Sequence, residues 1–351
     1  MPVLRVPTSF AIGIPVNSAT VMTEQSQARE PFLVIRGEGQ SDQALRGAVV
    51  AIGNFDGVHR GHRAVIAAAL ERAGRLRRPA AALTFEPHPR SFFRPDEPLF
   101  RLTDERAKLR LLAATGLDGA IVLPFDATLA GLSAQQFISR ILLTRLAVGG
   151  VAIGFDFHFG LNRTGSPGYL AEQGTISGFA VDIVSRYEDA GRLVRSGLIR
   201  SALGAGRVTE ANALLGYPWF VSAAVLHGDK RGRKLGYPTA NLRLDPNCGL
   251  AHGIYAVRVG MNGCRYDGVA SFGRRPMFDQ GVALLEVFMF DFSSDLYGKA
   301  IDVAFIDWIR PERKFESIDA LVQRMDEDSR AARAALARAK DAFPSLGQLA
   351  G

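Results

Sequence analysis

The sequence predicts two successive domains: a doubly wound α/β domain with a parallel sheet, then an antiparallel β-barrel followed by a C-terminal helix. Between residues 48 and 185, apolar strand-like runs alternate with helical stretches, which is the order of βαβ units. After residue 220 the pattern changes to short apolar runs separated by glycine turns, which is typical of an antiparallel barrel. We therefore expect two separate cores in one chain.

The elements of the first half follow from the apolar periodicity. We expect strands over residues 48–53, 80–85, 119–125, 149–157 and 179–185. Helices are expected after the first of these strands and over residues 104–115 and 134–146. In a doubly wound sheet, ligands bind beyond the carboxyl ends of the strands, so the loops that follow these strands are expected to share one site.

The second half begins with a short helix over residues 207–216. Barrel strands are expected over residues 221–228, 253–260, 265–273, 283–292 and 300–309, and a closing helix over residues 317–343. We divide the chain into a disordered tail (1–21), a first domain (22–205), a linker helix (206–218) and a second domain (219–345). Met22 is a candidate for the true start, which the N-terminal peptide mass of the native protein would test.

Composition limits the classes of protein. With 351 residues, 47% of them hydrophobic, the chain can bury two cores. Its two cysteines, Cys248 and Cys264, form no C-x-x-C pair, which favours a reducing, cytoplasmic location. No apolar run reaches the roughly 20 residues that span a bilayer. The net charge of +7 comes from scattered arginines, which favour a positive field for small anions over nucleic-acid binding.

The most informative segment is residues 48–70, where His59 and His62 flank Gly61 between a buried strand and a helix. A helix that begins there directs free N–H groups and its positive dipole end toward the loop, where anionic oxygens are stabilised. Two imidazoles three residues apart lie on one face of a helical turn, so both can face a triphosphate. A zinc site and a purely structural H-x-G-H are the alternative interpretations.

With its surroundings this segment resembles the H-x-G-H nucleotidyltransferases, and specifically the bifunctional bacterial riboflavin kinase/FAD synthetases. The likeness covers most of the chain. It rests on TFEPHP (84–89), LTDERAKLRLL (102–112), GFDFHFGLNRTGSPGYL (154–170), KLGYPTANL (234–242) and the glutamate in LLEVFMFDF (284–292). The resemblance implies a Rossmann-like nucleotidyltransferase domain that is followed by a riboflavin kinase barrel.

For the first domain the resemblance implies transfer of AMP from ATP to FMN, which gives FAD and pyrophosphate. Because the FMN phosphate can itself attack, catalysis consists of positioning and charge stabilisation. His59 and His62 are the implied catalytic residues. The implied nucleotide and phosphate ligands are Asn54, Asp56, Gly61, Asp156, Ser196 and Arg200, and the implied flavin wall is Phe85, Pro87, His88 and Pro89. A turn or cap role for Asp156, and simple rigidity for the prolines, remain alternatives.

One segment departs from the family pattern. Members usually carry I-S-S-T-x-I-R before the helix that ends the first domain, whereas this chain has V-R-S-G-L-I-R over residues 194–200. Ser196 and Arg200 are retained, but Arg195 and Gly197 replace two hydroxyl residues. Hydrogen-bond donors that act in the transition state are worth several kcal/mol each. Two outcomes follow: the Arg195 guanidinium compensates for the lost hydroxyls, or adenylyl transfer is impaired. Ser166 also stands where an acidic residue often occurs.

For the second domain, the basic loop H-G-D-K-R-G-R-K-L-G supplies the implied phosphate-binding residues Gly228, Gly232, Lys234 and Gly236. Thr239 and Asn241 are two residues apart on one expected strand face, and the resemblance implies that both give oxygen ligands to Mg²⁺. Glu286 lies in an otherwise apolar strand, where an unpaired carboxylate is costly. The resemblance makes it the general base for the riboflavin hydroxyl, with a salt bridge or outward exposure as the alternative.

Arg310 and Phe315, in R-P-E-R-K-F-E-S, resemble the family's flavin-side flap, with a surface turn as the alternative. Taken together, the sequence predicts a cytoplasmic bifunctional enzyme that uses riboflavin, FMN, FAD and ATP as small-molecule ligands, with Mg²⁺ and with neither nucleic acid nor membrane. A riboflavin kinase whose first domain is degenerate, or senses a nucleotide or flavin, is the alternative. Self-association is left open.

Overall fold

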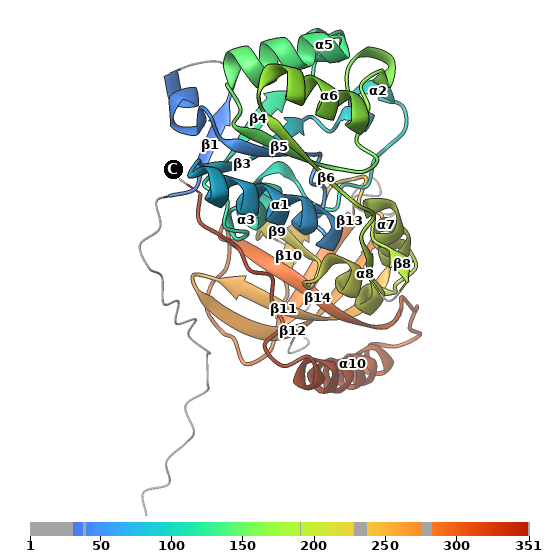
Figure 1. The fold of residues 1–351 in the computed structure, drawn as a ribbon. Helices are drawn as coiled ribbons and strands as arrows, with labels where there is room; N and C mark the ends of the chain where they lie inside the picture. The colour runs from blue at the N-terminus through green and yellow to red at the C-terminus, as the bar shows by residue number, and fades with distance from the viewer. Residues whose placement is uncertain (1–30, 38–39, 190, 228–236, 275–282, 350–351) are drawn as a thin grey trace, which may run out of the picture.

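The computed structural model describes residues 31–37, 40–189, 191–227, 237–274 and 283–349 (Figure 1). The expected disordered tail over residues 1–21 lies outside this part of the chain, as does Met22. The same holds for the phosphate-loop residues Gly228, Gly232, Lys234 and Gly236.

The first half contains a parallel sheet of the expected kind. Its six strands are β1 (Leu33–Arg36), β2 (Val49–Ile52), β3 (Ala80–Glu86), β4 (Gly119–Pro124), β5 (Gly150–Gly154) and β6 (Ala180–Val184). Their order is β1-β4-β3-β2-β5-β6, and every described pairing is parallel. The chain winds from β2 toward one edge and then returns to place β5 on the other side of β2. The carboxyl ends of β2 and β5 therefore form the switch point where such sheets bind ligands.

Helices cover both faces of this sheet (Figure 1). In β2, Val49 and Ala51 belong to one core while Val50 and Ile52 belong to the other, as strand alternation requires. Helices α1 (Arg60–Leu76) and α3 (Glu105–Ala113) lie on the face toward the barrel. The opposite face carries α5 (Ala134–Gln136), the π-helix η2 (Phe137–Arg145) and α6 (Pro167–Ser177).

Shorter elements complete the first half: η1 (Gln40–Leu45), α2 (Pro89–Phe93), α4 (Ala127–Ala130), η3 (Leu161–Arg163), the hairpin β7 (Glu188–Asp189) and β8 (Arg192–Leu193), α7 (Ser196–Gly204) and α8 (Val208–Leu215). The sequence did not reveal β1, because four residues carry too little periodicity. It also missed α6, whose glycines and mixed polarity hide an amphipathic pattern. Every strand expected in the first half is present.

The second half is an antiparallel barrel, so the predicted fold class is confirmed. Its strands are β9 (Phe220–Ala224), β10 (Ala240–Arg243), β11 (Gly253–Met261), β12 (Cys264–Arg274), β13 (Ala283–Met289) and β14 (Ala300–Pro311). They run in the order β10-β13-β12-β11-β14-β9. A bridge between Leu226 and Asn241 joins the two ends of this order, so the sheet closes on itself. Helix α10 (Ile318–Arg338) packs on the outside.

The two halves share one apolar core. Residues of α1, α3, α7 and α8 belong to the same buried cluster as the barrel interior. A polar clamp reinforces this contact: the Arg110 guanidinium of α3 makes two bonds of 2.7 Å to the Asp302 carboxylate of β14, and Ser222 also donates to Asp302. Near the C-terminus, Leu349 pairs with Phe32 beside β1. The halves therefore form a single packed body.

The clamp predicts a stability effect. The Arg110 and Asp302 side chains are only 22% and 14% exposed, so Arg110→Ala would leave a largely desolvated carboxylate without its partner. We expect a loss of about 3 kcal/mol in the free energy of unfolding, as for other buried pairs that lose one member. The control is Arg75→Ala, whose helical ion pair is 62% exposed and is expected to contribute under about 0.5 kcal/mol. Urea unfolding measures both, and equal midpoints for the two variants would contradict this prediction.

Candidate active sites

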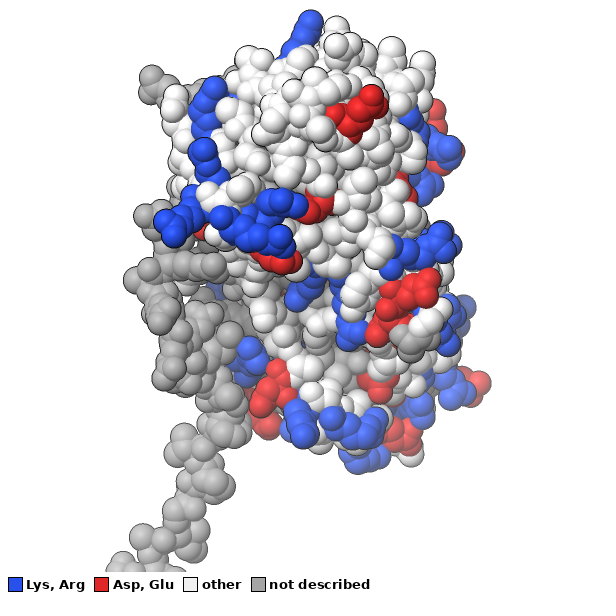
Figure 2. Space-filling model, viewed as in Figure 1, with Lys and Arg blue, Asp and Glu red and all other residues white. Residues whose placement is uncertain are grey.

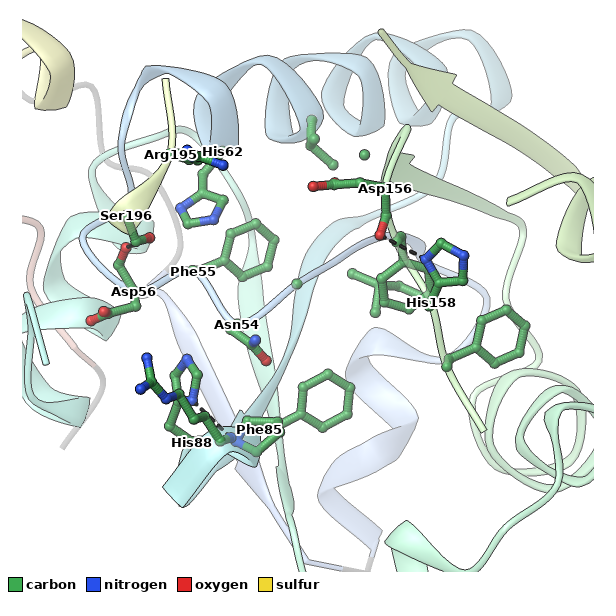
Figure 3. Close-up of a pocket in the computed structure, with 18 of the residues that line it drawn as sticks. Asn54, Phe55, Asp56, His62, Phe85, His88, Asp156, His158, Arg195 and Ser196 are labelled. Carbon is green, nitrogen blue, oxygen red and sulfur yellow. Dashed lines mark hydrogen bonds between the residues drawn. The ribbon is translucent and has the colours of Figure 1, made fainter. Parts of the chain in front are cut away.

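A cavity of about 1380 Å³ opens at the carboxyl ends of β2 and β5, at the switch point of the sheet. Most residues that the sequence assigned to the first site line it: Asn54, Asp56, His59, Gly61, His62, Phe85, His88, Pro89, Asp156, Ser196 and Arg200. Pro87 is not among its lining residues. Figure 3 shows His62, Asp56 and Ser196 toward one end of the cavity and Asp156 toward the other, with Asn54 between them.

The two histidines form a stacked pair at the start of α1. Their ring centroids are 3.6 Å apart and the planes differ by 13°. His59 caps the helix, because its Nδ1 accepts a hydrogen bond of 3.2 Å from the backbone N–H of His62. A neutral His59 ring therefore carries its proton on Nε2. A side chain at Gly61 would place a Cβ 3.2 Å from the His59 ring, so the glycine lets the two imidazoles stack.

Both imidazoles are held in the neutral form. Burial, and next the positive charge of Arg200, lowers the pKa of His59 to about 4 against the opposing effect of its backbone hydrogen bond. Burial, and then His59 and Lys108, lowers the pKa of His62 well below its ordinary value. The Nδ1 atom of His62 is inaccessible and has no hydrogen-bond partner among the described residues. At neutral pH the pair can offer hydrogen bonds to an anion without adding positive charge.

The loop before the histidines has an unusual backbone. Phe55 (φ 49°), Gly57 (φ 80°) and Val58 (φ 34°) all adopt the left-handed region, which is costly for a β-branched residue and is typical of functional sites. The side chain of Asp56 is buried and spans the loop. Its Oδ1 accepts the backbone N–H groups of Leu102 (2.9 Å) and Thr103 (3.1 Å).

The other oxygen of Asp56 contacts Arg200. The distance from Asp56 Oδ2 to Arg200 Nη2 is 2.5 Å, and Arg200 Nε also donates to the carbonyl of Phe100. The hydroxyl of Ser196 donates to the backbone oxygen of Asp56 at 3.0 Å. Asp56, Ser196 and Arg200 therefore join the loop to α7. Several of their hydrogen-bonding atoms are used in these contacts, so only the remaining ones can bind a ligand in the cavity.

The altered serine segment forms the start of α7. Arg195 is the exposed N-cap residue and makes no capping side-chain bond, so the first N–H groups of this helix are not capped by a side chain. No ion pair of Arg195 occurs with a described residue. A Cβ at Gly197 would meet nothing within 4 Å. This end of the cavity therefore combines two helix N-termini with an unpaired guanidinium, which is the chemistry of a phosphate site.

Six phenylalanines form an aromatic part of the cavity wall. Phe125 makes edge contacts with the rings of Phe85 and Phe93, and Phe159 stacks near Phe157 and packs against Phe137. All six rings line or border the cavity. The cavity therefore joins an apolar, flat-sided region, which can accept a planar ring system, to a polar end.

Three charged residues beneath the cavity were missed by the sequence interpretation. Lys108 is 1% exposed, and its Nζ lies 2.7 Å from Glu86. Glu86 is also bound in a fork by Arg101. Burial lowers the pKa of Lys108, although the neighbouring Glu86 opposes this shift. A signal was present, because Lys108 precedes the apolar Leu111 and Leu112 at helical spacing and so lies on the buried face.

Asp156 and Ser166 occupy more exposed positions. Asp156 lies in the loop after β5, and its backbone oxygen is 2.9 Å from Nδ1 of His158. Ser166 caps α6 by accepting the N–H of Tyr169 at 3.1 Å. Its role in the structure is that of a helix cap, which an acidic residue can also perform.

The second site lies on the outer face of the barrel. Strand pairing places Asn241 of β10 directly opposite Glu286 of β13, and Glu286 opposite Ser271 of β12. Directly opposed residues in antiparallel strands point to the same face. Glu286 lies between the interior-facing Leu285 and Val287, which are fully buried, so its half-buried carboxylate faces outward. Thr239 precedes Asn241 by two residues and so belongs to the same face.

Arg310 is placed differently from the expected flavin contact. Its guanidinium is 8% exposed and forms a fork with the carboxylate of Asp328 on α10, at 2.8 and 2.6 Å. The same guanidinium lies 5.8 Å from the ring centroid of Phe315. Arg310 therefore fixes α10 against β14 and orders the segment that carries Phe315.

Within the described ranges, no three His, Cys, Asp or Glu side chains come together as a metal site. No helix of the described part of the chain is both long and apolar enough to cross a membrane. On the face shown in Figure 2, positive side chains gather in several separate groups with acidic side chains beside them.

The fold and the cavity define a class: an α/β nucleotide-binding domain that is packed on an antiparallel barrel. Comparisons with known proteins agree with this class. Residues 41–198 match the family model described as FAD synthetase, and residues 215–336 match the one described as riboflavin kinase.

Whole-length relatives share the same arrangement. A bifunctional riboflavin kinase/FMN adenylyltransferase of Pseudomonas fluorescens is 40% identical over 302 residues, which cover 86% of this chain and 97% of the relative. The protein of that name from Escherichia coli (strain K12) is 39% identical, with 86% and 96% covered. A solved structure from Streptococcus pneumoniae, named a macrolide-efflux protein, is 32% identical with a TM-score of 0.77 and covers 86% of this chain and 99% of that one. The chain belongs to the bifunctional riboflavin kinase/FMN adenylyltransferase family, as the sequence motifs predicted.

The neutral histidine pair predicts a pH dependence of stability. Because the folded-state pKa of His59 is about 4 and its ordinary value is about 6.5, unfolding takes up a proton between these values. This difference has no effect on stability above pH 6.5, and it lowers the free energy of unfolding as the pH falls toward 4, by roughly 3 kcal/mol for one such group. His59→Asn, which can still cap the helix, should flatten this dependence.

Thermal unfolding at pH 7.5, 6 and 5 measures the effect. His158→Asn is the control, since His158 is exposed and its replacement should leave the wild-type slope unchanged. A His59→Asn variant with the same slope as wild type would contradict the prediction.

Proposed function

We propose that the α/β domain adenylylates FMN with ATP to give FAD and pyrophosphate, and that the barrel phosphorylates riboflavin with ATP to give FMN. The observation that carries the proposal is the cavity itself. It combines a neutral stacked histidine pair and two helix N-termini with an aromatic wall. This arrangement suits a nucleoside triphosphate and a flavin that bind side by side.

In the adenylyl transfer, an oxygen of the FMN phosphate attacks the α-phosphorus of ATP as the bond to the β-phosphate oxygen breaks. Nε2–H of His59 donates a hydrogen bond to the phosphates, because its Nδ1 is already an acceptor for the helix backbone. The N–H groups that begin α1 and α7, together with Arg195, stabilise the negative charge that moves onto pyrophosphate. Phe85, His88 and Pro89 border the flavin, and Asn54 and Asp156 border the nucleotide.

In the phosphoryl transfer, Glu286 accepts the proton of the riboflavin 5′-hydroxyl while this oxygen attacks the γ-phosphorus and ADP leaves. The side-chain oxygens of Thr239 and Asn241 fit Mg²⁺, which takes a few protein oxygens and completes its shell with phosphates and water. When bound, the ion neutralises phosphate charge. The register of β10 and β13 brings Asn241 beside Glu286, which supports one common site.

Each proposed activity belongs to one part of the chain. Adenylyl transfer belongs to residues 22–205, phosphoryl transfer to residues 219–345, and residues 206–218 link them. Phe315 borders the flavin in the barrel, and Arg310 keeps this segment in place. The phosphate loop with Gly228, Gly232, Lys234 and Gly236 belongs to the same proposal from sequence alone. A cytoplasmic location follows from the cysteine content.

The proposal is tested by chromatography of the products from riboflavin with Mg-ATP, beside a parallel reaction that starts from FMN. We expect FAD in both reactions and pyrophosphate in the second. FMN as the final product of the first, with no reaction in the second, would instead support the kinase-only alternative.

Substitutions should separate the two activities. Glu286→Gln keeps the size of the side chain but removes the base, so FMN formation should fall by on the order of 10²-fold or more, while FAD formation from supplied FMN persists. The combined His59→Ala and His62→Ala substitutions should produce the reverse pattern. Separate assays with riboflavin and with FMN give both rates, and loss of both activities in either variant would refute separate sites.

We expect the Arg195 guanidinium to act on the phosphates in place of the two hydroxyl residues that other family members carry. Arg195→Ala is expected to lower the rate of FAD formation by on the order of tenfold to 10²-fold through lost charge stabilisation, and to leave FMN formation unchanged. Gly197→Ser fits the open space at this position and replaces a poor helix former, so it should retain at least the wild-type rate. Steady-state assays with FMN and ATP measure both variants. Equal rates for Arg195→Ala and wild type would show that Arg195 does not act on the phosphates.

A further inference from the structure

The loop between β2 and α1 is fixed by side chains from three different segments. The carbonyl of Asp56 accepts the Ser196 hydroxyl at 3.0 Å, that of Gly57 accepts the Tyr217 hydroxyl at 2.7 Å, and that of Val58 accepts Nε of Arg63 at 3.2 Å. These are three successive peptide groups immediately before the catalytic His59. Such bonds set the orientation of each peptide plane in a left-handed stretch that is unfavourable by itself.

Tyr217 differs from the other two donors in its place in the chain. Ser196 and Arg63 belong to the α/β domain, whereas Tyr217 follows α8 and lies within the part of the chain that matches riboflavin kinase, residues 215–336. Leu215 of α8 also limits the same loop, because a Cβ at Gly57 would lie 3.3 Å from its Cδ2. The segment that leads from α8 into the barrel therefore contacts the loop between β2 and α1.

The side chain of Tyr217 is held in place by its surroundings. Tyr217 is 6% exposed, and Arg63 lies over its ring at 5.4 Å from the centroid. Burial raises the pKa of the Tyr217 hydroxyl, so this group remains a donor over the whole working range of pH. A buried carbonyl that loses such a donor keeps its full desolvation cost, which favours the observed loop conformation over alternatives.

We propose that Tyr217 is a positioning residue for adenylyl transfer: it fixes the peptide at Gly57 and thereby the placement of His59 and His62 against the phosphates. The inference rests on the proposed function of the cavity and adds a dependence on the segment that links α8 to the barrel. The adenylyl transfer site is then complete only when the segment after α8 is docked against the loop.

The test is Tyr217→Phe in the full-length protein, because this change removes one hydroxyl and keeps the ring. Misplacement of reacting groups lowers turnover more than binding, so we expect kcat for FAD formation from FMN to fall on the order of tenfold with KM for FMN within about twofold. FMN formation from riboflavin should be unchanged. Amide hydrogen exchange at Gly57 and Val58 should become faster.

The matched control is Tyr255→Phe. Tyr255 is a fully buried tyrosine of the barrel interior whose hydroxyl donates to the carbonyl of Ala251. Its replacement removes the same kind of bond from a carbonyl outside the loop, that of Ala251, so it should lower the thermal unfolding midpoint without changing FAD formation or exchange at Gly57.

Three results would overturn the inference. They are unchanged kcat in Tyr217→Phe, the same loss of FAD formation in Tyr255→Phe, and loss of both activities in Tyr217→Phe, which would make the residue purely structural. Absence of FAD formation by the wild-type protein would instead refute the proposed function. In that case the exchange rates at Gly57 and Val58 would still decide whether Tyr217 fixes the loop.

Discussion

The buried carboxylate of Asp56 makes the contacts on which the cavity of the α/β domain depends. It accepts two backbone N–H groups before α3 and the guanidinium of Arg200 from α7, and so joins three segments that are distant in sequence. A desolvated carboxylate is stable only when such partners surround it. The same contacts hold the loop whose residues Phe55, Gly57 and Val58 are left-handed, and they place both helix N-termini at one end of the cavity.

The buried position of His59 and His62 keeps both imidazoles neutral. Burial and the nearby Arg200 and Lys108 disfavour protonation of His59 and His62, so positive charge in the cavity comes from arginine and from helix N-termini. These groups keep their charge or dipole at every working pH, whereas an exposed imidazole near its ordinary pKa would not. Under the proposed function, this arrangement separates two tasks: fixed charge attracts the phosphates, and the imidazoles orient them.

The two candidate sites lie in one packed body. Helix α3 contributes Lys108 to the network beneath the cavity and Arg110 to the clamp with Asp302 of the barrel. Trp219, at the start of the barrel, donates to the carbonyl of Leu102, whose own N–H binds Asp56. Contacts of this kind mean that the domain boundary of the sequence is not a boundary of the site. A motion of the barrel relative to α3 would disturb the loop between β2 and α1.

The sequence by itself determined the fold class and the family, and it predicted site residues of which most in the first half line one cavity. The alternation of apolar runs sets the strands, glycine permits the H-x-G-H turn, and the motifs define the family, all of which are local patterns. Only the tertiary structure decided that Arg310 pairs with Asp328, that Lys108 is buried beneath the cavity, and that Tyr217 reaches the loop. Such contacts join residues far apart in the chain, and their partners follow from how the layers pack. No spacing within the sequence encodes that packing directly.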